Sequence, residues 1–511
     1  MSRAMSTYPV LPWAPAMLPT PLPHSGNYPP HGGQQNREEW EEGNLPDRKV
    51  TVSNLGHQPL SPLDGRYRQA TSELGEYFSE AALNRARVSV EIEWLITLCA
   101  EGVAGSTPLP AKTIESLRAV VRDFGETEIA QIAATEAVTK HDVKAVEYFV
   151  RDVLASHKLE SLSELVHFGC TSEDINNVSY ALVTRDALHK VWLPAFDAVV
   201  TRLTELAHSW RDAPMLAKTH GQPATPTTFG KELAVFAGRL NRVRERITRV
   251  PSLAKFSGAT GTFSAHVVAE PGVNWPIVSK NFVEGLGLTW NPLTTQIESH
   301  DATAELFTAM SHANRILHNL ATDIWTYISV GYLTQIPEPG ATGSSTMPHK
   351  INPIRFENAE ANLEISSSLL EGLAATLVTS RLQRDLTDST TQRNIGVAFG
   401  HSLVALTNLD KGLHEISLDE RALMADLQSN WEVLAEAIQT VMRAEIVRGN
   451  SSETDPYAIV KELTRGNAVD AQALAAFVHG LDISDAAKKS LAELTPEGYV
   501  GLASSLVDYL D

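Results

Sequence analysis

The chain is 511 residues long, with 43% hydrophobic and 20% charged residues, so it exceeds the size of a single core and we expect two or three domains. Its 42 Lys and Arg against 61 Asp and Glu give a formal net charge of −19, which argues against general binding to nucleic acid or to anionic membranes. Two cysteines, no apolar run of about 18 residues and no basic leader followed by an apolar stretch argue against a disulfide framework and indicate a cytoplasmic protein.

Residues 1–58 differ in composition from the remainder of the chain. Nine of the 27 prolines fall within the first 50 residues, which also contain the acidic stretch Glu38-Glu39-Trp40-Glu41-Glu42. Such a segment buries too little apolar surface to offset its conformational entropy. We expect a disordered, proline-rich extension, with a recognition ligand for another protein as the alternative.

Helical periodicity begins after this extension. Val88, Ile92, Leu95 and Cys99 recur on one face of a helix, and strand signals are few along the chain. We therefore expect a mainly α protein whose first helical domain spans residues 59–161.

Two short polar segments stand where helices are expected to begin. His141-Asp142 opens one helical run, and Cys170-Thr171-Ser172-Glu173-Asp174 precedes another. Small hydroxyl and acidic groups at such places are typical N-caps, because they accept hydrogen bonds from the free N–H groups of the first turn. Capping explains each segment taken by itself, and a polar binding site is the alternative.

A third segment interrupts the helices of the second expected domain, residues 162–412. It reads Lys218-Thr219-His220-Gly221-Gln222-Pro223-Ala224-Thr225-Pro226, and its Gly and Pro residues predict a break between helices. A histidine at such a break is more often a surface or capping residue than a catalytic one, so His220 alone does not identify a function.

The clearest predicted helix follows Pro292. Apolar residues repeat there at steps of four and three over three heptads, at Leu306, Met310, Ala313, Leu317, Leu320, Ile324 and Tyr327. This stripe predicts a bundle helix about 40 Å long, at about 1.5 Å per residue. Long helices of this kind usually associate with copies of themselves, while a bundle within one chain is the alternative.

The segment from Pro337 to Pro353 is expected to be a loop between two long helices. Its core reads Gly343-Ser344-Ser345-Thr346-Met347-Pro348-His349-Lys350-Ile351-Asn352-Pro353. Glycines give this loop freedom to hinge, and its polar side chains gather directly before a helix start, which favours anions. Composition alone also fits a solvated connection. Beyond it, the proline-free stretch from Ile354 to Asp455 predicts several consecutive helices, and residues 413–511 form the expected C-terminal helical domain.

Taken together, these segments resemble the fumarase/aspartase superfamily and, within it, the adenylosuccinate lyase family. The superfamily signature Gly-Ser-Ser-x-Met-Pro-x-Lys-x-Asn-Pro is matched in full from Gly343 to Pro353. His349 and the residues around His220 resemble the adenylosuccinate branch, whereas the argininosuccinate, aspartate and fumarate branches differ at these points. The resemblance extends from Ser61 to the C-terminus and includes residues 61–67 and 384–389.

The resemblance implies a mainly α, three-domain fumarase/aspartase-like fold with a central long-helix bundle forming the core of a homotetramer. It implies active sites shared between subunits. The implied reaction is the anti β-elimination of fumarate from adenylosuccinate to give AMP, and from the succinylated imidazole carboxamide ribotide (SAICAR) to give AICAR, in purine nucleotide biosynthesis.

The implied catalytic pair is Ser344 as the base and His220 as the acid. They lie 124 positions apart, in different segments, which suits opposite faces of a substrate. A serine must be activated to act as a base, and Lys350 is the expected source of positive charge. Donors on the loop and Lys350 would also stabilise the carbanion, and loop closure would deliver Ser344.

The resemblance also implies a set of binding residues. It places Arg66, Tyr67, Ser389 and Arg393 around the nucleotide phosphate, and Thr171 and Ser172 on the succinyl carboxylate. The remaining pocket residues that it implies are His141, Asp142, Gln296, Ser345, Lys350, Asn358 and Arg384. Lys140 is expected beside them, although it matches no fixed residue of the family. We expect a small-molecule nucleotide substrate with no metal and no cofactor. Two alternatives stay open, an argininosuccinate lyase of the same fold and a helical oligomer that has lost catalysis.

Overall fold

The computed structural model describes residues 59–337, 347, 350–464 and 469–511. The chain divides into Met1–Gln58, which lies outside the described residues together with the extension predicted there, and Pro59–Asp511. Within the described part, no helix is long and apolar enough to cross a membrane.

The first helices confirm the periodicity seen in the sequence. Val88, Ile92, Leu95 and Cys99 are all fully buried on one helix, α3, and Ser79 caps its first turn by accepting a hydrogen bond from the N–H of Ala82. The elements of this part are α1 (Arg68–Thr71), η1 (Ser72–Leu74), α2 (Gly75–Phe78), α3 (Glu80–Ala100), η2 (Val103–Gly105), α4 (Ala111–Arg122), α5 (Glu126–Thr139), α6 (Asp142–Ser156) and η3 (Glu160–Leu165).

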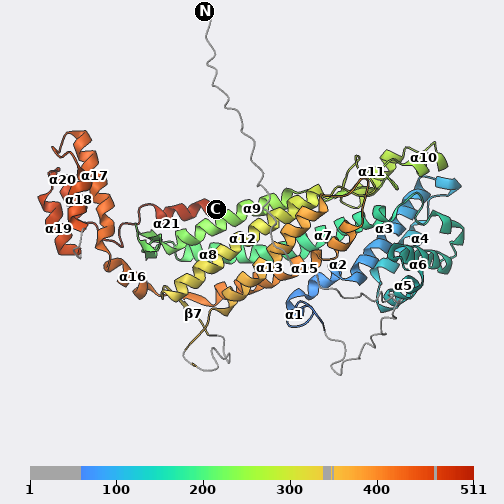
Figure 1. Cartoon of the computed structure of the whole chain (residues 1–511), viewed down its shortest axis with the longest axis horizontal. Coiled ribbons are helices and arrows are strands. Elements are labelled where there is room, and N and C mark those ends of the chain that lie inside the picture. Colours follow the sequence, from blue (N-terminus) through green and yellow to red (C-terminus); the bar gives the residue numbers. More distant parts are fainter. Residues whose placement is uncertain (1–58, 338–346, 348–349, 465–468) are drawn as a thin grey trace, which may run out of the picture. The chain divides into compact units, whose positions relative to one another are not determined.

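The centre of the fold is a ring of five long helices. Figure 1 shows them side by side, and each packs against two others, in the order α8, α9, α12, α13, α15 and back to α8. The long elements of this part are α7 (Ser172–Ala187), η4 (Leu188–Trp192), α8 (Leu193–Ser209), α9 (Phe229–Arg249), α12 (Asp301–Ser329), α13 (Ile354–Leu377) and α15 (Ile395–His414). The helix predicted after Pro292 is therefore confirmed as α12.

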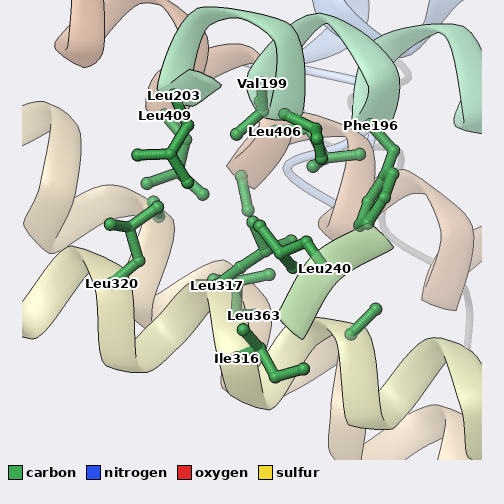
Figure 2. Close-up of a cluster of buried hydrophobic side chains, with 14 of the residues drawn as sticks. Phe196, Val199, Leu203, Leu240, Ile316, Leu317, Leu320, Leu363, Leu406 and Leu409 are labelled. Atoms are coloured by element: carbon green, nitrogen blue, oxygen red, sulfur yellow. The ribbon is translucent and has the colours of Figure 1, made fainter. Parts of the chain in front are cut away.

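The apolar stripe of α12 packs inside the chain's own bundle. Leu306, Met310, Leu317 and Leu320 are buried there without any second copy. Figure 2 shows Leu317 and Leu320 facing Leu409 and other apolar side chains of the neighbouring helices. The stripe thus fills the core of one bundle, and it carries no argument for self-association.

Short strands and helices connect the long helices. The short helices are α10 (Ser264–Ala269), α11 (Trp275–Gly285) and α14 (Thr387–Gln392). The strands form antiparallel pairs β1 with β4, β2 with β3 and β7 with β8, and the parallel pair β5 with β6. Their bounds are β1 (Pro214–Met215), β2 (Lys218–Thr219), β3 (Gln222–Pro223), β4 (Thr227–Thr228), β5 (Leu253–Ala254), β6 (Thr289–Trp290), β7 (Leu333–Gln335) and β8 (Ile416–Leu418).

The last helices build a separate apolar cluster around Leu434, Met442 and Val478. The elements are α16 (Glu420–Gln428), η5 (Trp431–Leu434), α17 (Ala435–Arg448), α18 (Pro456–Thr464), α19 (Ala471–Gly480), α20 (Asp485–Ala492), α21 (Ala503–Leu506) and η6 (Val507–Leu510). Another cluster unites residues 88–178 with residues 254–288, and Val507 packs into the central bundle. The limits of the three expected domains, 59–161, 162–412 and 413–511, stay a prediction.

Candidate active site

The amino end of α7 carries the predicted carboxylate-binding residues Thr171 and Ser172. Asp174 caps this end, because its Oδ2 accepts a hydrogen bond from the N–H of Thr171 at 2.8 Å. The capping interpretation of this segment is therefore confirmed. The cap leaves Thr171 and Ser172 half-buried at a helix start, where N–H groups favour an anion.

A buried ion pair with Lys255 fixes Asp174, the residue that caps α7. The Nζ of Lys255 lies 2.8 Å from Oδ1 of Asp174, and both side chains are fully buried. Asp174 also accepts hydrogen bonds from the backbone N–H groups of Ser257 and Gly258. With its charge neutralised and its oxygens occupied, this carboxylate ties the segment after β5 to the start of α7.

The turn before Thr171 is held by α3. His167 has a positive φ of 60°, and both its backbone N–H and its Nδ1 contact the buried carboxylate of Glu91. Trp94 donates a hydrogen bond from Nε1 to the carbonyl of Phe168 at 3.1 Å. Cys170, which completes the turn, has a pKa raised well above its ordinary value by burial, so its thiol stays protonated.

Arg87 connects three of the predicted segments. It is buried on α3 and donates hydrogen bonds to Oδ1 of Asn84 at 3.0 Å, to Oδ1 of Asn176 at 2.9 Å and to Oδ2 of Asp142 at 2.8 Å. Burial alone would raise the pKa of Asp142, but Arg87, the N–H of Val143 and Arg393 together lower it. Asp142 is thus a fixed anion next to α7.

Predicted residues His141 and Lys140 stand directly before Asp142. His141 caps α6 by accepting a hydrogen bond from the N–H of Lys144 at Nδ1, which confirms the predicted helix start. Lys140 ends α5 in the left-handed conformation, with φ of 56°. Both side chains are exposed, so the ends of two helices present them together.

Arg384 joins two other predicted residues to α7. It donates to Oε1 of Glu173 at 2.8 Å and to Oε1 of Gln296 at 3.3 Å, while Gln296 donates to the carbonyl of Ala259. Burial raises the pKa of Glu173, although Arg384 and Asn176 oppose the shift. Asn176 links Glu173 to Arg87, so these side chains form one polar network.

The predicted phosphate-binding residues divide between two places. Ser389 and Arg393 stand one helical turn apart at α14, and Arg393 lies between Asp142 and Glu80. Tyr67 instead accepts a hydrogen bond from Nδ2 of Asn358 on α13, at 3.1 Å. Arg66, beside Tyr67, is exposed.

The orientation of Asn358 is set by its neighbours. Its Oδ1 accepts hydrogen bonds from Nδ2 of Asn362 and from Nδ2 of Asn408, so its own amide N–H group faces Tyr67. His401, whose pKa is lowered by burial, contacts Oδ1 of Asn362 at 2.8 Å. The Asn358 amide is therefore preorganised rather than free to rotate.

His220 lies at the tip of the β2–β3 hairpin, between α8 and α9, so the predicted break between helices is confirmed. His220 and Gly221 are the two central residues, with φ of 54° and 74°, which is the conformation of a type I′ turn. The side chain is exposed. This tight turn projects the imidazole from the end of the bundle.

Strand β7, which precedes the signature segment, lies at the same end of the bundle as the hairpin of His220. Asp426 joins the hairpin to the start of β7, because Lys218 of the hairpin contacts its Oδ2 at 2.6 Å and the hydroxyl of Tyr332, just before β7, donates to the same oxygen. Lys350 is exposed, and the next carbonyl, that of Ile351, accepts a hydrogen bond from Gln335 of β7. Ser344, Ser345 and His349 lie outside the described residues.

The helices separate the predicted site into two ends. The 16 residues of α7, the five of the π-helical turn η4 and the 17 of α8 follow one another, about 55 Å of helix between Thr171 and the hairpin of His220. The 29 residues of α12 likewise separate Gln296 from β7 by about 40 Å. One chain therefore places His220, the predicted acid, far from the predicted carboxylate-binding residues.

Sequence reasoning missed the residues that hold this network together. These are Arg87 and Glu91 on the buried face of α3 and Lys255 directly after β5, all of them buried. The local signal for each is a charged residue among apolar neighbours. Within the described part of the chain, no group of three or more His, Cys, Asp or Glu side chains is placed to hold a metal ion.

Family models match most of the described chain. The family described as Lyase matches residues 65–364, and the family described as Adenylosuccinate lyase C-terminal matches residues 380–500. The chain is 47% identical over 450 residues to the adenylosuccinate lyase of Legionella pneumophila (strain Corby), covering 88% of this chain and 97% of that protein. It is 45% identical over 453 residues to the adenylosuccinate lyase of Escherichia coli (strain K12), covering 88% of this chain and 98% of that protein.

The chain belongs to the adenylosuccinate lyase family. The predicted resemblance is thereby confirmed, and these relatives favour the adenylosuccinate lyase family over the argininosuccinate lyases that the sequence had left open.

Solved structures confirm the predicted fumarase/aspartase-like fold of this adenylosuccinate lyase family member. A fumarate lyase from Mesorhizobium sp. BNC1 superposes with a TM-score of 0.68 at 20% identity, over 86% of this chain and 97% of that one. A 3-carboxy-cis,cis-muconate lactonizing enzyme from Pseudomonas putida gives a TM-score of 0.64 at 21% identity, over 86% and 96%. At such low identity the likeness concerns the fold alone.

Proposed function

We propose that this lyase eliminates fumarate from adenylosuccinate to give AMP, and from SAICAR to give AICAR, as a cytoplasmic enzyme of purine nucleotide biosynthesis. The observation that carries the proposal is the network around α7, in which Thr171 and Ser172 open the helix beside Arg384, Gln296 and Arg393. A helix start flanked by two arginines suits a substrate that carries both carboxylates and a phosphate.

In this proposal Ser344 removes the proton beside the succinyl carboxylate and His220 protonates the leaving nitrogen. The exposed tip position leaves the imidazole of His220 accessible to a substrate held elsewhere. Lys350 supports Ser344 as a base and stabilises the carbanion. The substrate is bound by Thr171 and Ser172 at the succinyl carboxylate, by Arg66, Tyr67, Ser389 and Arg393 at the phosphate, and by Lys140, His141, Asp142, Gln296, Ser345, Asn358 and Arg384 around it.

Several copies of the chain supply each active site in this proposal, within a homotetramer. The support is geometric, since about 55 Å of continuous helix lies between Thr171 and the hairpin of His220. Acid and base must both lie within hydrogen-bond reach of one substrate. A second copy that brings its hairpin to the amino end of α7 satisfies this requirement without unfolding either chain.

Fumarate release from adenylosuccinate by the purified protein tests the reaction. We expect the wild type to release fumarate and AMP, and the Ser344→Ala and His220→Ala proteins to fail with their oligomeric state unchanged. A wild type that is inactive on adenylosuccinate and SAICAR contradicts the proposal. That result would favour one of the two alternatives, an argininosuccinate lyase or a helical oligomer that has lost catalysis.

Mixing two inactive proteins tests the sharing of sites. His220→Ala and Arg384→Gln affect opposite ends of the bundle, so hybrids formed after subunit exchange contain some sites in which both residues are intact. We expect the mixture to regain measurable activity, while each variant mixed with itself stays inactive. A mixture that exchanges subunits and stays inactive contradicts shared sites.

A further inference from the structure

Arg393 has two carboxylate partners that differ in how firmly they are held. Its Nη2 lies 3.1 Å from Oδ2 of Asp142, and its Nη1 donates to Oε1 of Glu80. The side chain of Asp142 is 27% exposed and is also bound by Arg87, whereas that of Glu80 is 67% exposed. Asp142 is therefore the fixed partner and Glu80 the replaceable one.

Glu80 stands at the first residue of α3, where only its own side-chain rotamers need to change for it to leave Arg393. The hydrogen bond to Glu80 is the main reason why the pKa of Arg393 is raised; burial opposes the rise, and the charge of Glu80 adds to it. Exposed ion pairs contribute little to stability, so an incoming anion displaces such a carboxylate at small cost. A phosphate offers the same planar fork a stronger, doubly charged partner.

Space for an anion adjoins this arginine. Arg393 lines a hollow of about 400 Å³ between the first short helices and the start of α15, together with Arg68 and Ser79. The hollow is lined by two arginines and one carboxylate, Asp64, and of the arginines Arg393 is already paired with Glu80, which lies outside the lining. The guanidinium of Arg393, rather than the hollow beside it, is thus already paired with a carboxylate of the same chain.

We propose that Glu80 is an internal competitor of the substrate phosphate, which holds Arg393 in the free enzyme and is displaced when a nucleotide binds. This inference rests on the proposed function, in which Arg393 binds the phosphate. Glu80 lowers the affinity for every ligand that carries the phosphate, AMP included, and leaves the affinity for fumarate unchanged. It takes no part in the chemical step.

Binding of AMP and fumarate to the full-length oligomer tests the inference. In Glu80→Gln we expect the dissociation constant of AMP and the KM for adenylosuccinate to fall together by about two- to fivefold, the range of one exposed ion pair. The kcat and the inhibition constant of fumarate stay at wild-type values. Glu76→Gln is the matched control, because Glu76 is 69% exposed, lies four residues before Glu80 and pairs with Arg85, outside the proposed site.

An Arg393→Gln variant distinguishes a failure of the proposed phosphate site from a failure of the proposed competition by Glu80. If it binds AMP as the wild type does, Arg393 does not hold the phosphate, and both the site assignment and the inference fall. If it weakens AMP binding while Glu80→Gln binds AMP no tighter than wild type, the site assignment stands and the inference alone falls. Equal tightening in Glu80→Gln and Glu76→Gln also overturns the inference, because it shows a general effect of charge.

Discussion

The Nδ1 atom of His167 lies 2.6 Å from Oε1 of Glu91, a carboxylate of α3 that is fully buried. Oε2 of the same carboxylate accepts a hydrogen bond from the backbone N–H of His167. One glutamate thereby fixes both the ring and the left-handed backbone of the residue that turns the chain toward Thr171. The order of the proposed carboxylate site therefore depends on a contact made four residues before Thr171.

This contact predicts a pH-dependent stability. Burial alone would lower the pKa of His167, but the hydrogen bond to Glu91 and the charges of Glu91, Glu147 and Asp174 raise it above 6.5. A pKa raised on folding adds stability that is complete below pH 6.5 and is lost as the pH rises through the folded pKa. We expect the free energy of unfolding of His167→Gln to be about 1–3 kcal/mol lower than that of the wild type below pH 6.5, and the difference to shrink at alkaline pH.

Melting temperatures of both proteins between pH 5.5 and 9.5 measure this difference. The exposed His189→Gln serves as the control for removing a histidine. A difference that stays constant, or grows toward high pH, speaks against a protonated His167 in the folded state.

Substitution of Arg87 tests the network that connects α3, α6 and α7. Arg87→Met removes three hydrogen bonds and leaves the carboxylate of Asp142 with the N–H of Val143 and Arg393 as its partners. We expect a loss of about 3–5 kcal/mol in the free energy of unfolding by urea. We also expect a lower kcat, because Asp142 and Asn176 lose their common anchor.

The control for Arg87→Met lies on the same helix. Arg85 is more exposed and pairs with the exposed Glu76, so Arg85→Met is expected to cost less than about 1 kcal/mol and to leave kcat unchanged. If both variants lose the same free energy of unfolding, the loss comes from removing any arginine of α3 and not from the network of Arg87.

Local features of the sequence were enough to predict α12, the apolar face of α3 and the helix starts at His141 and Thr171. These depend on residues within one or two turns of each other. The pairing of Arg87 with Asp142 joins positions 55 residues apart, and that of Lys255 with Asn177 joins positions 78 apart. Such contacts depend on how helices pack, which local periodicity does not encode.

The predicted site residues came from the resemblance, and the structure groups only some of them. Asp142, Gln296, Arg384 and Arg393 join the network around α7, whereas His220 stands at the opposite end of the bundle. The heptad pattern of α12 could not distinguish a stripe that packs inside one chain from one that packs against a copy. The side chains decide this, since Leu317 and Leu320 are buried within a single chain.

The buried pair of Lys255 and Asp174 predicts a compensated double variant. Lys255→Met leaves the fully buried carboxylate of Asp174 without its cation, and we expect a loss of about 3–5 kcal/mol. Lys255→Met combined with Asp174→Asn removes both charges and keeps an oxygen for the N–H of Thr171, so part of the loss is expected to return. Urea unfolding measures both, and a double variant no more stable than Lys255→Met would contradict the charge argument.

Gly261 predicts a defect that begins in the backbone and ends at Gln296. Its φ is +75°, and a Cβ at this position would lie 2.2 Å from the carbonyl oxygen of Thr294. Gly261→Ala must therefore push the segment at Thr294 away, which removes Gln296 from Ala259 and Arg384. We expect a loss of about 1–3 kcal/mol in stability and a higher KM for adenylosuccinate, measured by thermal unfolding and initial rates.

Gly272→Ala is the matched control for Gly261→Ala, because no atom lies within 4 Å of its added Cβ and its φ is not positive. If Gly261→Ala lowers the stability but keeps the wild-type KM, displacing Gln296 does not weaken substrate binding, and Gln296 is then not a binding residue.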